Sequence, residues 1–249
     1  MNKDIEIEKG ILKKKRGWIR DNIALVSIIA IAACLRIYKI DYQSLWVDEI
    51  HTLNETNPEF SFSEMYSALL RAEPHPQLYF VLVHFAFKIF GYSSLVLRLF
   101  SAVVGVAGVI SMYFLGREIF NRKTGLYAAI LIAFNYFHLF YSQEARMYAL
   151  FFLCTTLSFY FFIRFLKRPT TKSCLIYTFF ALTMAYSHFF GLFSLASQYL
   201  ILLFFIIKPI TSTGLRLFYL SLMSGIITFI CYLPNYYIIE RSAGVTSSP

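Results

Sequence analysis

The stretch Leu95–Lys123, LVLRLFSAVVGVAGVISMYFLGREIFNRK, decides the fold class. Residues 95–115 carry one charged side chain, Arg98, and are long enough to cross about 30 Å of hydrocarbon at about 1.5 Å per helical residue. The connection that follows holds Arg117, Arg122 and Lys123, and short basic connections face the cytoplasm in membrane proteins. The stretch therefore predicts a transmembrane helix that ends on the cytoplasmic side.

The composition extends this prediction to the whole chain. Of 249 residues, 58% are hydrophobic and 15% are charged, against about 25% charged in soluble domains. The apolar runs are apolar all round and do not alternate, which excludes a membrane β-barrel. The net charge of +9 lies mainly in the N-terminal tail and in short connections, a pattern that orients membrane helices and does not indicate nucleic-acid binding. The chain is thus predicted to be an all-α polytopic membrane protein.

Working outward from this helix divides the chain into three regions: a basic cytoplasmic tail (1–20), a transmembrane domain (21–233) and an outer tail (234–249). Residues 41–92 form an outer loop, in which Met65–Arg71 is expected to be a surface helix with Ser61 or Ser63 as its cap. Residues 77–91 are apolar but short for a crossing, so they are expected to lie at or dip into the outer surface. The predicted crossings, about seven in all, are 23–40, 95–115, 124–140, 149–166, 174–187, 189–207 and 215–233.

Ionisable side chains collect on the predicted outer face, where they would mark a site facing a cavity. Asp48 and Glu49 are adjacent carboxylates just after the first crossing, and two close carboxylates raise each other's pKa toward that of a usable base. The alternative is that both are ordinary solvated loop residues. Prolines on either side of His75 fix an extended backbone after Glu73, which indicates either a rigid lead-in to the surface helix or a fixed acid or metal ligand.

Two further groups on this face can also be interpreted either as structural or as part of a site. Glu144 and Arg146 fit the start of a helix, with Arg146 extending outward, or a site in which Arg146 faces an anionic substrate group. His188 stands among aromatic residues, where a histidine is often a packed, hydrogen-bonded ring. The four cysteines have no paired spacing and indicate packing.

Several motifs, in this order, resemble family 39 glycosyltransferases of the GT-C superfamily. The stretch LWVDEIHTL resembles the LWxDExxT motif of that family's first outer loop, and YSQEARMYAL resembles its YSQEARxYAL stretch. The motifs are Leu45–Leu53, Pro74–Tyr79 (PHPQLY), Arg98–Ala102 (RLFSA), Gly116–Phe120 (GREIF), Tyr141–Leu150 and Tyr186–Phe193 (YSHFFGLF).

The resemblance implies a GT-C-type bundle whose first outer loop carries surface helices. It also implies an enzyme of the cell membrane that transfers a sugar from a polyprenyl-phosphate donor to a hydroxyl or phosphate of a lipid, glycan or protein acceptor on the outer face, with inversion. Asp48 would be the base and Glu49 its support. The residues expected to bind substrate are Glu73, His75, Tyr79, Arg98, Gln143, Glu144, Arg146 and His188.

No cofactor is required on this hypothesis, although a divalent cation held by Glu73 and His188 is an alternative. The sequence departs from the family pattern at Gln77 and Phe100, where proline is usual. Family members usually continue with further helices and an outer domain that contact the donor phosphate and the acceptor. A second hypothesis is therefore a non-catalytic or truncated membrane subunit that binds polyprenyl-phosphate lipids. A transporter is disfavoured because there is no inverted repeat.

Overall fold

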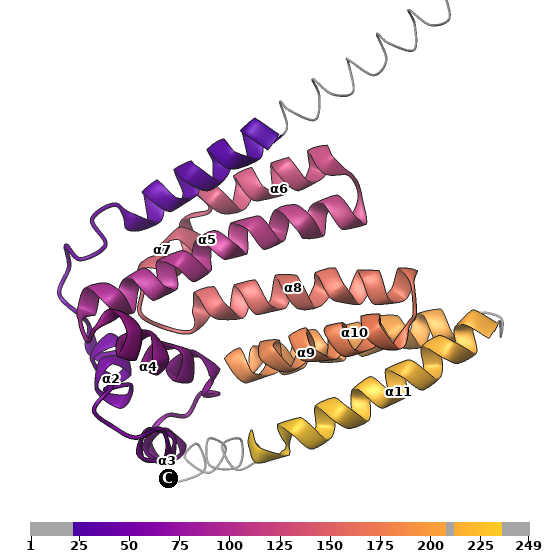
Figure 1. The fold of residues 1–249 in the computed structure, drawn as a ribbon. Coiled ribbons are helices and arrows are strands. Elements are labelled where there is room, and N and C mark those ends of the chain that lie inside the picture. Colours follow the sequence, from indigo (N-terminus) through magenta and orange to yellow (C-terminus); the bar gives the residue numbers. More distant parts are fainter. Residues whose placement is uncertain (1–21, 208–211, 236–249) are drawn as a thin grey trace, which may run out of the picture.

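The computed structural model describes residues 22–207 and 212–235, which form helices and connecting turns without a β-strand. Long helices lie side by side, and α2, α3 and α4 gather at one end of them (Figure 1). After the helix Asn22–Ile37, the elements are α2 (Val47–Glu55), α3 (Phe62–Ala72), α4 (Leu78–Phe90), α5 (Ser94–Ile119), α6 (Arg122–Phe134), α7 (Tyr136–Gln143), α8 (Tyr148–Lys167), α9 (Thr171–Ser187), α10 (Phe190–Ile207), α11 (Ser212–Tyr232) and the 3-10 turn Leu233–Asn235. The prediction of an all-α membrane protein is confirmed.

Helix α5 contains the stretch that decided the fold class, and it packs most extensively against α8 and α6. The Ser93 hydroxyl caps its start by accepting from the Val96 N–H at 3.3 Å. Close contact with α6 depends on glycine: a Cβ added at Gly125 would meet the Tyr113 carbonyl oxygen at 2.6 Å. The two helices therefore approach backbone to backbone.

The crossing predicted at 124–140 is not one continuous helix. It forms α6 and α7, which are bent by 59° relative to each other. Asn135 leaves the helical conformation (ψ 121°), and its side chain caps α7 by accepting from the His138 N–H at 2.9 Å. Arg36 donates to the carbonyls of Ile132 and Ala133, at 3.3 Å each, so carbonyls at the break keep hydrogen-bond partners.

Helical structure covers all the predicted crossings, but length and composition separate them. Three described helices are long and apolar enough to cross a membrane on their own, namely α5, α8 and the helix spanning Gly214–Asn235. The bent pair of α6 and α7 makes a fourth if it is counted as one span. The helices Asn22–Ile37 and Phe190–Ile206 are apolar but shorter.

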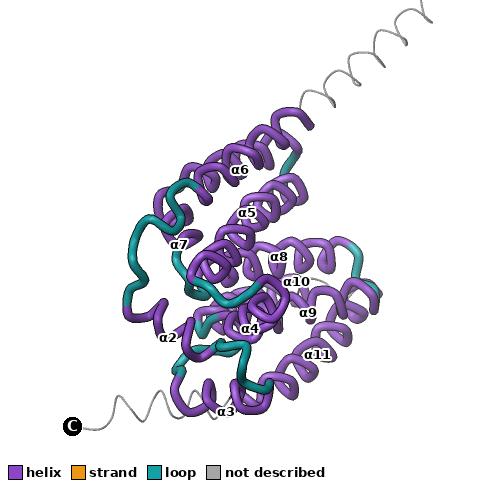
Figure 2. Tube along the Cα trace, turned by 60° about the vertical axis from the view of Figure 1, so that its left-hand side comes forward, coloured by secondary structure: helices purple, strands orange, loops and turns teal. Residues whose placement is uncertain are grey.

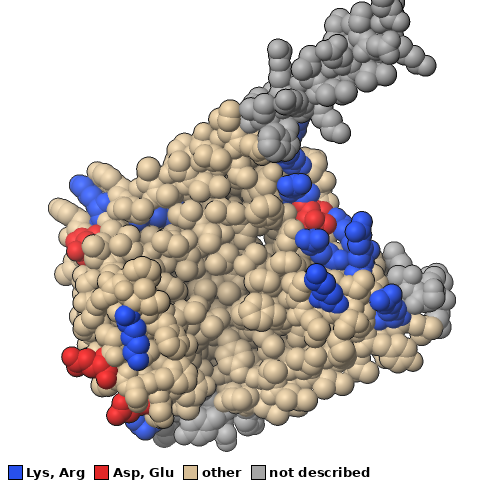
Figure 3. All heavy atoms as spheres, in the orientation of Figure 1, with Lys and Arg blue, Asp and Glu red and all other residues tan. Residues whose placement is uncertain are grey.

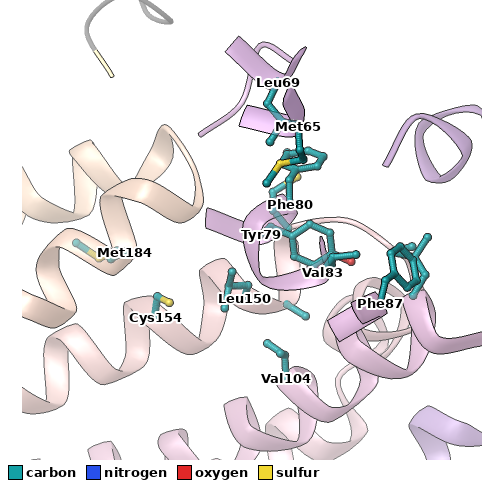
Figure 4. Packing of buried hydrophobic residues seen from close by; sticks show 14 residues of the cluster. Met65, Leu69, Tyr79, Phe80, Val83, Phe87, Val104, Leu150, Cys154 and Met184 are labelled. Carbon is teal, nitrogen blue, oxygen red and sulfur yellow. The ribbon is translucent and has the colours of Figure 1, made fainter. Parts of the chain in front are cut away.

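The loop predicted at residues 41–92 folds into α2, α3 and α4, which carry several of the candidate site residues. Ser61 caps α3 through a reciprocal pair with Glu64, as one of the two predicted caps. Apolar side chains of α3 and α4, including Met65, Leu69, Phe80 and Val83, belong to one buried cluster with side chains of α5, α8 and α9 (Figure 4). Helix α4 has 13 residues and matches the segment predicted to be a short surface helix. This packing holds the loop against the ends of the long helices.

The two ends of the bundle differ in charge. Lys and Arg side chains gather at one end of the face shown in Figure 3, and Asp and Glu side chains appear mainly at the other. The loops near α2 run over the acidic end (Figure 2). The acidic end is therefore where the predicted site residues collect.

The α5–α6 contact predicts the effect of a single methyl group. We expect Gly125→Ala to lower the free energy of unfolding by about 1–3 kcal/mol, because the backbone at Tyr113 must shift. The matched control is Gly225→Ala on α11, where the new Cβ would lie 3.3 Å from the Tyr199 hydroxyl oxygen and should cost little. Chemical unfolding in detergent micelles measures both, and equal values would contradict the proposed close approach.

Candidate functional site

The Glu49 side chain is buried (1% exposed) and forms the centre of the loop structure. Its two oxygens accept from Arg98, with Nε at 3.0 Å and Nη2 at 2.6 Å. The backbone N–H groups of Ala145 (2.9 Å) and Trp46 (3.4 Å) also donate to this carboxylate. One carboxylate thus joins α2, α5 and the turn before α8.

The Arg98 guanidinium also has several hydrogen-bond partners. Besides Glu49, its guanidinium donates to the carbonyls of Ile40, Gln43 and Ser44, at 3.1, 2.7 and 3.2 Å. Arg98 was predicted to bind substrate, and in this geometry its donors also hold the segment from Ile40 to Ser44 against α5. The pair of Arg98 and Glu49 therefore determines where the next side chain, Asp48, can lie.

Asp48 lies in the first turn of α2 and is half-buried. No hydrogen bond or ion pair from the described residues occupies its carboxylate, whereas its backbone carbonyl accepts from Thr52 (3.0 Å) and lies 3.5 Å from Nη1 of Arg146. Adjacent residues of a helix point in different directions, so the neighbouring carboxylates separate. Glu49 is held in the interior, and Asp48 is left accessible.

A second group of ionisable side chains lies beside Asp48. We name Glu55, Glu73, His75, Arg146 and His188 the acid–histidine cluster. Within it, Glu73 Oε1 lies 2.5 Å from His75 Nδ1 and 3.5 Å from Nη2 of Arg146. Burial favours a raised pKa for Glu73, but the hydrogen bond with His75 and the charge of Arg146 outweigh it, so its pKa lies below the ordinary value.

Glu55 belongs to this cluster, although no motif in the sequence singles it out. Burial and the charge of Glu73 raise the pKa of Glu55 to about 7, against a smaller opposing effect of Arg146. The buried Oε2 of Glu55 has no hydrogen-bond partner among the described residues. Near neutral pH, Glu55 can therefore hold a proton while Glu73 keeps its charge.

His188 is nearly buried (8% exposed) at the end of α9. Burial, then the nearby His75 and Arg146, lower the pKa of His188 to about 4, so the ring is neutral at pH 7. The Phe190 N–H donates to Nδ1 at 3.1 Å, which places the remaining ring proton on Nε2. His188 also packs on aromatic rings, including Phe151 with centroids 5.2 Å apart, so the packed ring and the site residue are the same histidine.

A cavity of about 900 Å³ lies beside the ion pair of Glu49 and Arg98. Glu144, Trp46 and Tyr148 line it, with Glu49 and Arg98 also in its wall. Burial, then the charges of Glu49 and Asp48, raise the pKa of Glu144 to about 7. A protonated Glu144 can donate a hydrogen bond in this cavity, whereas its ionised form can only accept.

Two predicted substrate residues have internal partners. The Tyr79 side chain is fully buried, and its hydroxyl lies 2.7 Å from the Ser101 hydroxyl. The Gln143 amide donates to the carbonyls of Leu35, Arg36 and Tyr38, at 3.2, 3.3 and 3.1 Å, and so caps the end of the first helix. Both side chains thus support the walls of the site through partners inside the protein.

Arg146 keeps an unused donor inside the site. Its Nη1 donates to the Thr52 hydroxyl at 3.2 Å, and its guanidinium lies 5.7 Å from the Phe80 ring centre. Its Nε is buried and has no partner among the residues described. Glu73 and His188 were predicted as candidate metal ligands. Within the described part of the chain, no group of three or more His, Cys, Asp or Glu side chains is arranged to hold a metal ion.

Comparison with known proteins places the chain in the GT-C class of membrane proteins. Residues 74–238 match the dolichyl-phosphate-mannose-protein mannosyltransferase family. The chain therefore belongs to that family, which confirms the resemblance found in the sequence. No curated protein matches the chain.

The fold is also similar to a solved structure from S. cerevisiae, described as the protein O-mannosyltransferase Pmt1-Pmt2 complex bound to the sugar donor. The TM-score is 0.70 and the identity 17%, over 90% of this chain and 34% of the yeast chain. At this identity the likeness shows the fold. The chain spans about a third of the length of that protein.

The buried ion pair predicts a large loss of stability when one partner is removed. Glu49→Gln leaves the Arg98 guanidinium buried without its counter-charge, and we expect the free energy of unfolding to fall by about 3–5 kcal/mol. Glu118→Gln is the matched control, because the Glu118–Lys167 pair (2.9 Å) is largely exposed and should contribute less than about 1 kcal/mol. Similar losses for both variants in detergent unfolding would show that burial does not decide the effect.

The raised pKa of Glu55 predicts a pH dependence of stability. Between its ordinary value of 4.5 and about 7, the folded state binds a proton that the unfolded state has lost. The free energy of unfolding should therefore fall as the pH rises through this window. Glu55→Gln mimics the protonated acid and should flatten the slope, whereas Glu59→Gln, at an exposed position, should leave it unchanged. Unfolding measured from pH 5 to 8 checks this, and parallel curves for all three proteins would contradict it.

Proposed function

We propose that the chain is a membrane glycosyltransferase that moves a sugar from a polyprenyl-phosphate donor to an acceptor hydroxyl on the outer face, with inversion. The observation that carries the proposal is the accessible carboxylate of Asp48, beside a fully paired Glu49 and next to the acid–histidine cluster. Family membership supports the reaction class. The printed names of the family and of the yeast structure support mannose as the first sugar to test and a protein as the first acceptor.

Asp48 acts as the base in a single displacement. The acceptor oxygen attacks the anomeric carbon as its proton passes to the Asp48 carboxylate, and the bond from that carbon to the phosphate oxygen breaks on the opposite side. The polyprenyl phosphate leaves with the bonding electrons. The donor is already activated by its phosphate, so no nucleotide takes part.

The neighbouring side chains support these charges. Arg146 lies beside Asp48 with an unused Nε donor, which suits it to the phosphate as negative charge develops there. The neutral His188 offers an Nε2 proton as a hydrogen-bond donor. Glu73 limits the mobility of Arg146, and Glu49 with Arg98 positions α2 without contacting the substrate.

The membrane orientation follows from the charges of the two ends. The exposed Lys and Arg side chains at the ends of α5, α8 and α9 belong on the cytoplasmic side by the positive-inside rule. Asp48 then faces outward in the cell membrane, and the predicted cytoplasmic tail, residues 1–20, lies outside the described residues. A lipid-linked donor reaches this site from the outer leaflet.

The mechanism predicts a variant that folds and binds but does not transfer. We expect Asp48→Asn to lower transfer by at least about a hundredfold, because the amide cannot accept the acceptor proton, while thermal unfolding stays close to wild type. The assay uses purified protein in lipid nanodiscs with polyprenyl-phosphate mannose and a Ser/Thr-rich peptide. Asp41→Asn makes the same change at an exposed position in the same loop and should keep full activity.

Normal transfer by Asp48→Asn would exclude Asp48 as the base. A wild-type chain that binds polyprenyl phosphate without transfer would instead support the second hypothesis, a lipid-binding subunit. The reason for this second hypothesis is that the yeast protein is about three times longer than the matched region.

A further inference from the structure

A groove lies between α10 and α11, and none of its lining residues belongs to the acid–histidine cluster. Two cavities of about 410 and 240 Å³ form it, and they share the wall residues Tyr199, Gly225 and Phe229. The groove runs from Ile206 and Phe218 at one end to residues 192 and 233 at the other. Its lining is almost wholly apolar.

The rim of this groove is open toward the surroundings of the bundle. Leu203, Leu222 and Phe229 are 52%, 52% and 68% exposed, although all three are large apolar side chains. On a helix that spans a membrane, such a rim faces hydrocarbon. An occupant therefore enters from the bilayer and must itself be apolar along its length.

The end of the groove near Ile206 meets a surface rich in cations. The exposed basic side chains at this end, which we name the basic face, are Arg117, Lys123, Arg164, Lys167, Arg168, Lys172 and Arg216. Figure 3 shows such a concentration at one end of the molecule. Among the described residues, Glu118 is the one acidic side chain at this end, and Lys167 pairs with it. The basic face thus has a large unbalanced positive charge.

Hydrogen bonds between α9 and α11 place two of these cations together at the mouth of the groove. Cys174 Sγ donates to the Leu220 carbonyl (3.1 Å), and one turn on, Thr178 donates to the Ser224 hydroxyl (2.7 Å). The helices are therefore parallel and in register. Lys172 and Arg216 lie about one helical turn or less before this first contact, so their side chains emerge at the same end.

We propose that the α10–α11 groove binds an acyl chain of an anionic phospholipid, with the headgroup on the basic face at Lys172 and Arg216. The apolar, laterally open groove accounts for the chain. The unbalanced cations account for the sign of the headgroup, because basic residues at a membrane surface attract anionic lipids. This site is separate from the proposed sugar-transfer site and does not depend on it.

Native mass spectrometry of the purified chain in a non-ionic detergent tests the headgroup. Equal amounts of phosphatidylglycerol and phosphatidylcholine are added, and the retained lipid is counted. We expect wild type to prefer phosphatidylglycerol, and the double variant Lys172→Gln/Arg216→Gln to bind it about tenfold more weakly. Lys88→Gln removes an exposed cation of α4 and should change nothing. Equal retention of the two lipids by wild type would overturn the proposal.

Filling the groove tests the position of the acyl chain. Gly225 forms part of its floor, with the Tyr199 hydroxyl oxygen 3.3 Å from an added Cβ. Gly225→Leu should reduce retained phosphatidylglycerol severalfold, while Gly225→Ala keeps most of it. If Gly225→Leu does not fold, Leu222→Trp covers the groove from its exposed rim. Unchanged retention in the folded variant, or displacement of phosphatidylglycerol by equimolar polyprenyl phosphate, would overturn the assignment.

Discussion

The structure depends on one buried ion pair, between Glu49 and Arg98. Taking a carboxylate and a guanidinium out of water costs free energy that only close pairing and complete hydrogen bonding offset. Here Glu49 receives four donors and Arg98 reaches three loop carbonyls. The segments that meet at this pair are far apart in the sequence, so α2 has one stable position against α5 and the turn before α8.

That position separates the roles of two adjacent carboxylates. Glu49 is held in the interior, and Asp48, one residue earlier on α2, remains open beside Arg146. A similar separation operates between Glu55 and Glu73, where the neighbouring Arg146 and His75 keep the charge on Glu73 and leave Glu55 to carry the proton. Burial and unequal partners thus give Asp48 and Glu49 different access, and Glu55 and Glu73 different protonation.

The two ends of the bundle carry opposite charge. Its acidic end carries the outer loop and the proposed chemistry, and its basic end collects exposed cations around the ends of α5, α8, α9 and α11. The α10–α11 groove connects these two ends along the apolar part of the molecule. Both proposed ligands are lipids with anionic groups: Arg146 suits the acidic end to the donor phosphate, and the basic face suits the other end to a phospholipid headgroup.

The sequence by itself determined the helical membrane class, most helix positions and the family, and it narrowed the cap of α3 to Ser61 or Ser63, because long apolar runs and local motifs depend on neighbouring residues. Only the tertiary structure decided the break at Asn135, where Arg36 supplies distant donors, and the buried partners of Tyr79 and Gln143. It also added Glu55, whose pKa is raised by burial and by Glu73. Burial and charge pairing arise from contacts between distant segments, and residue order along one segment does not specify them.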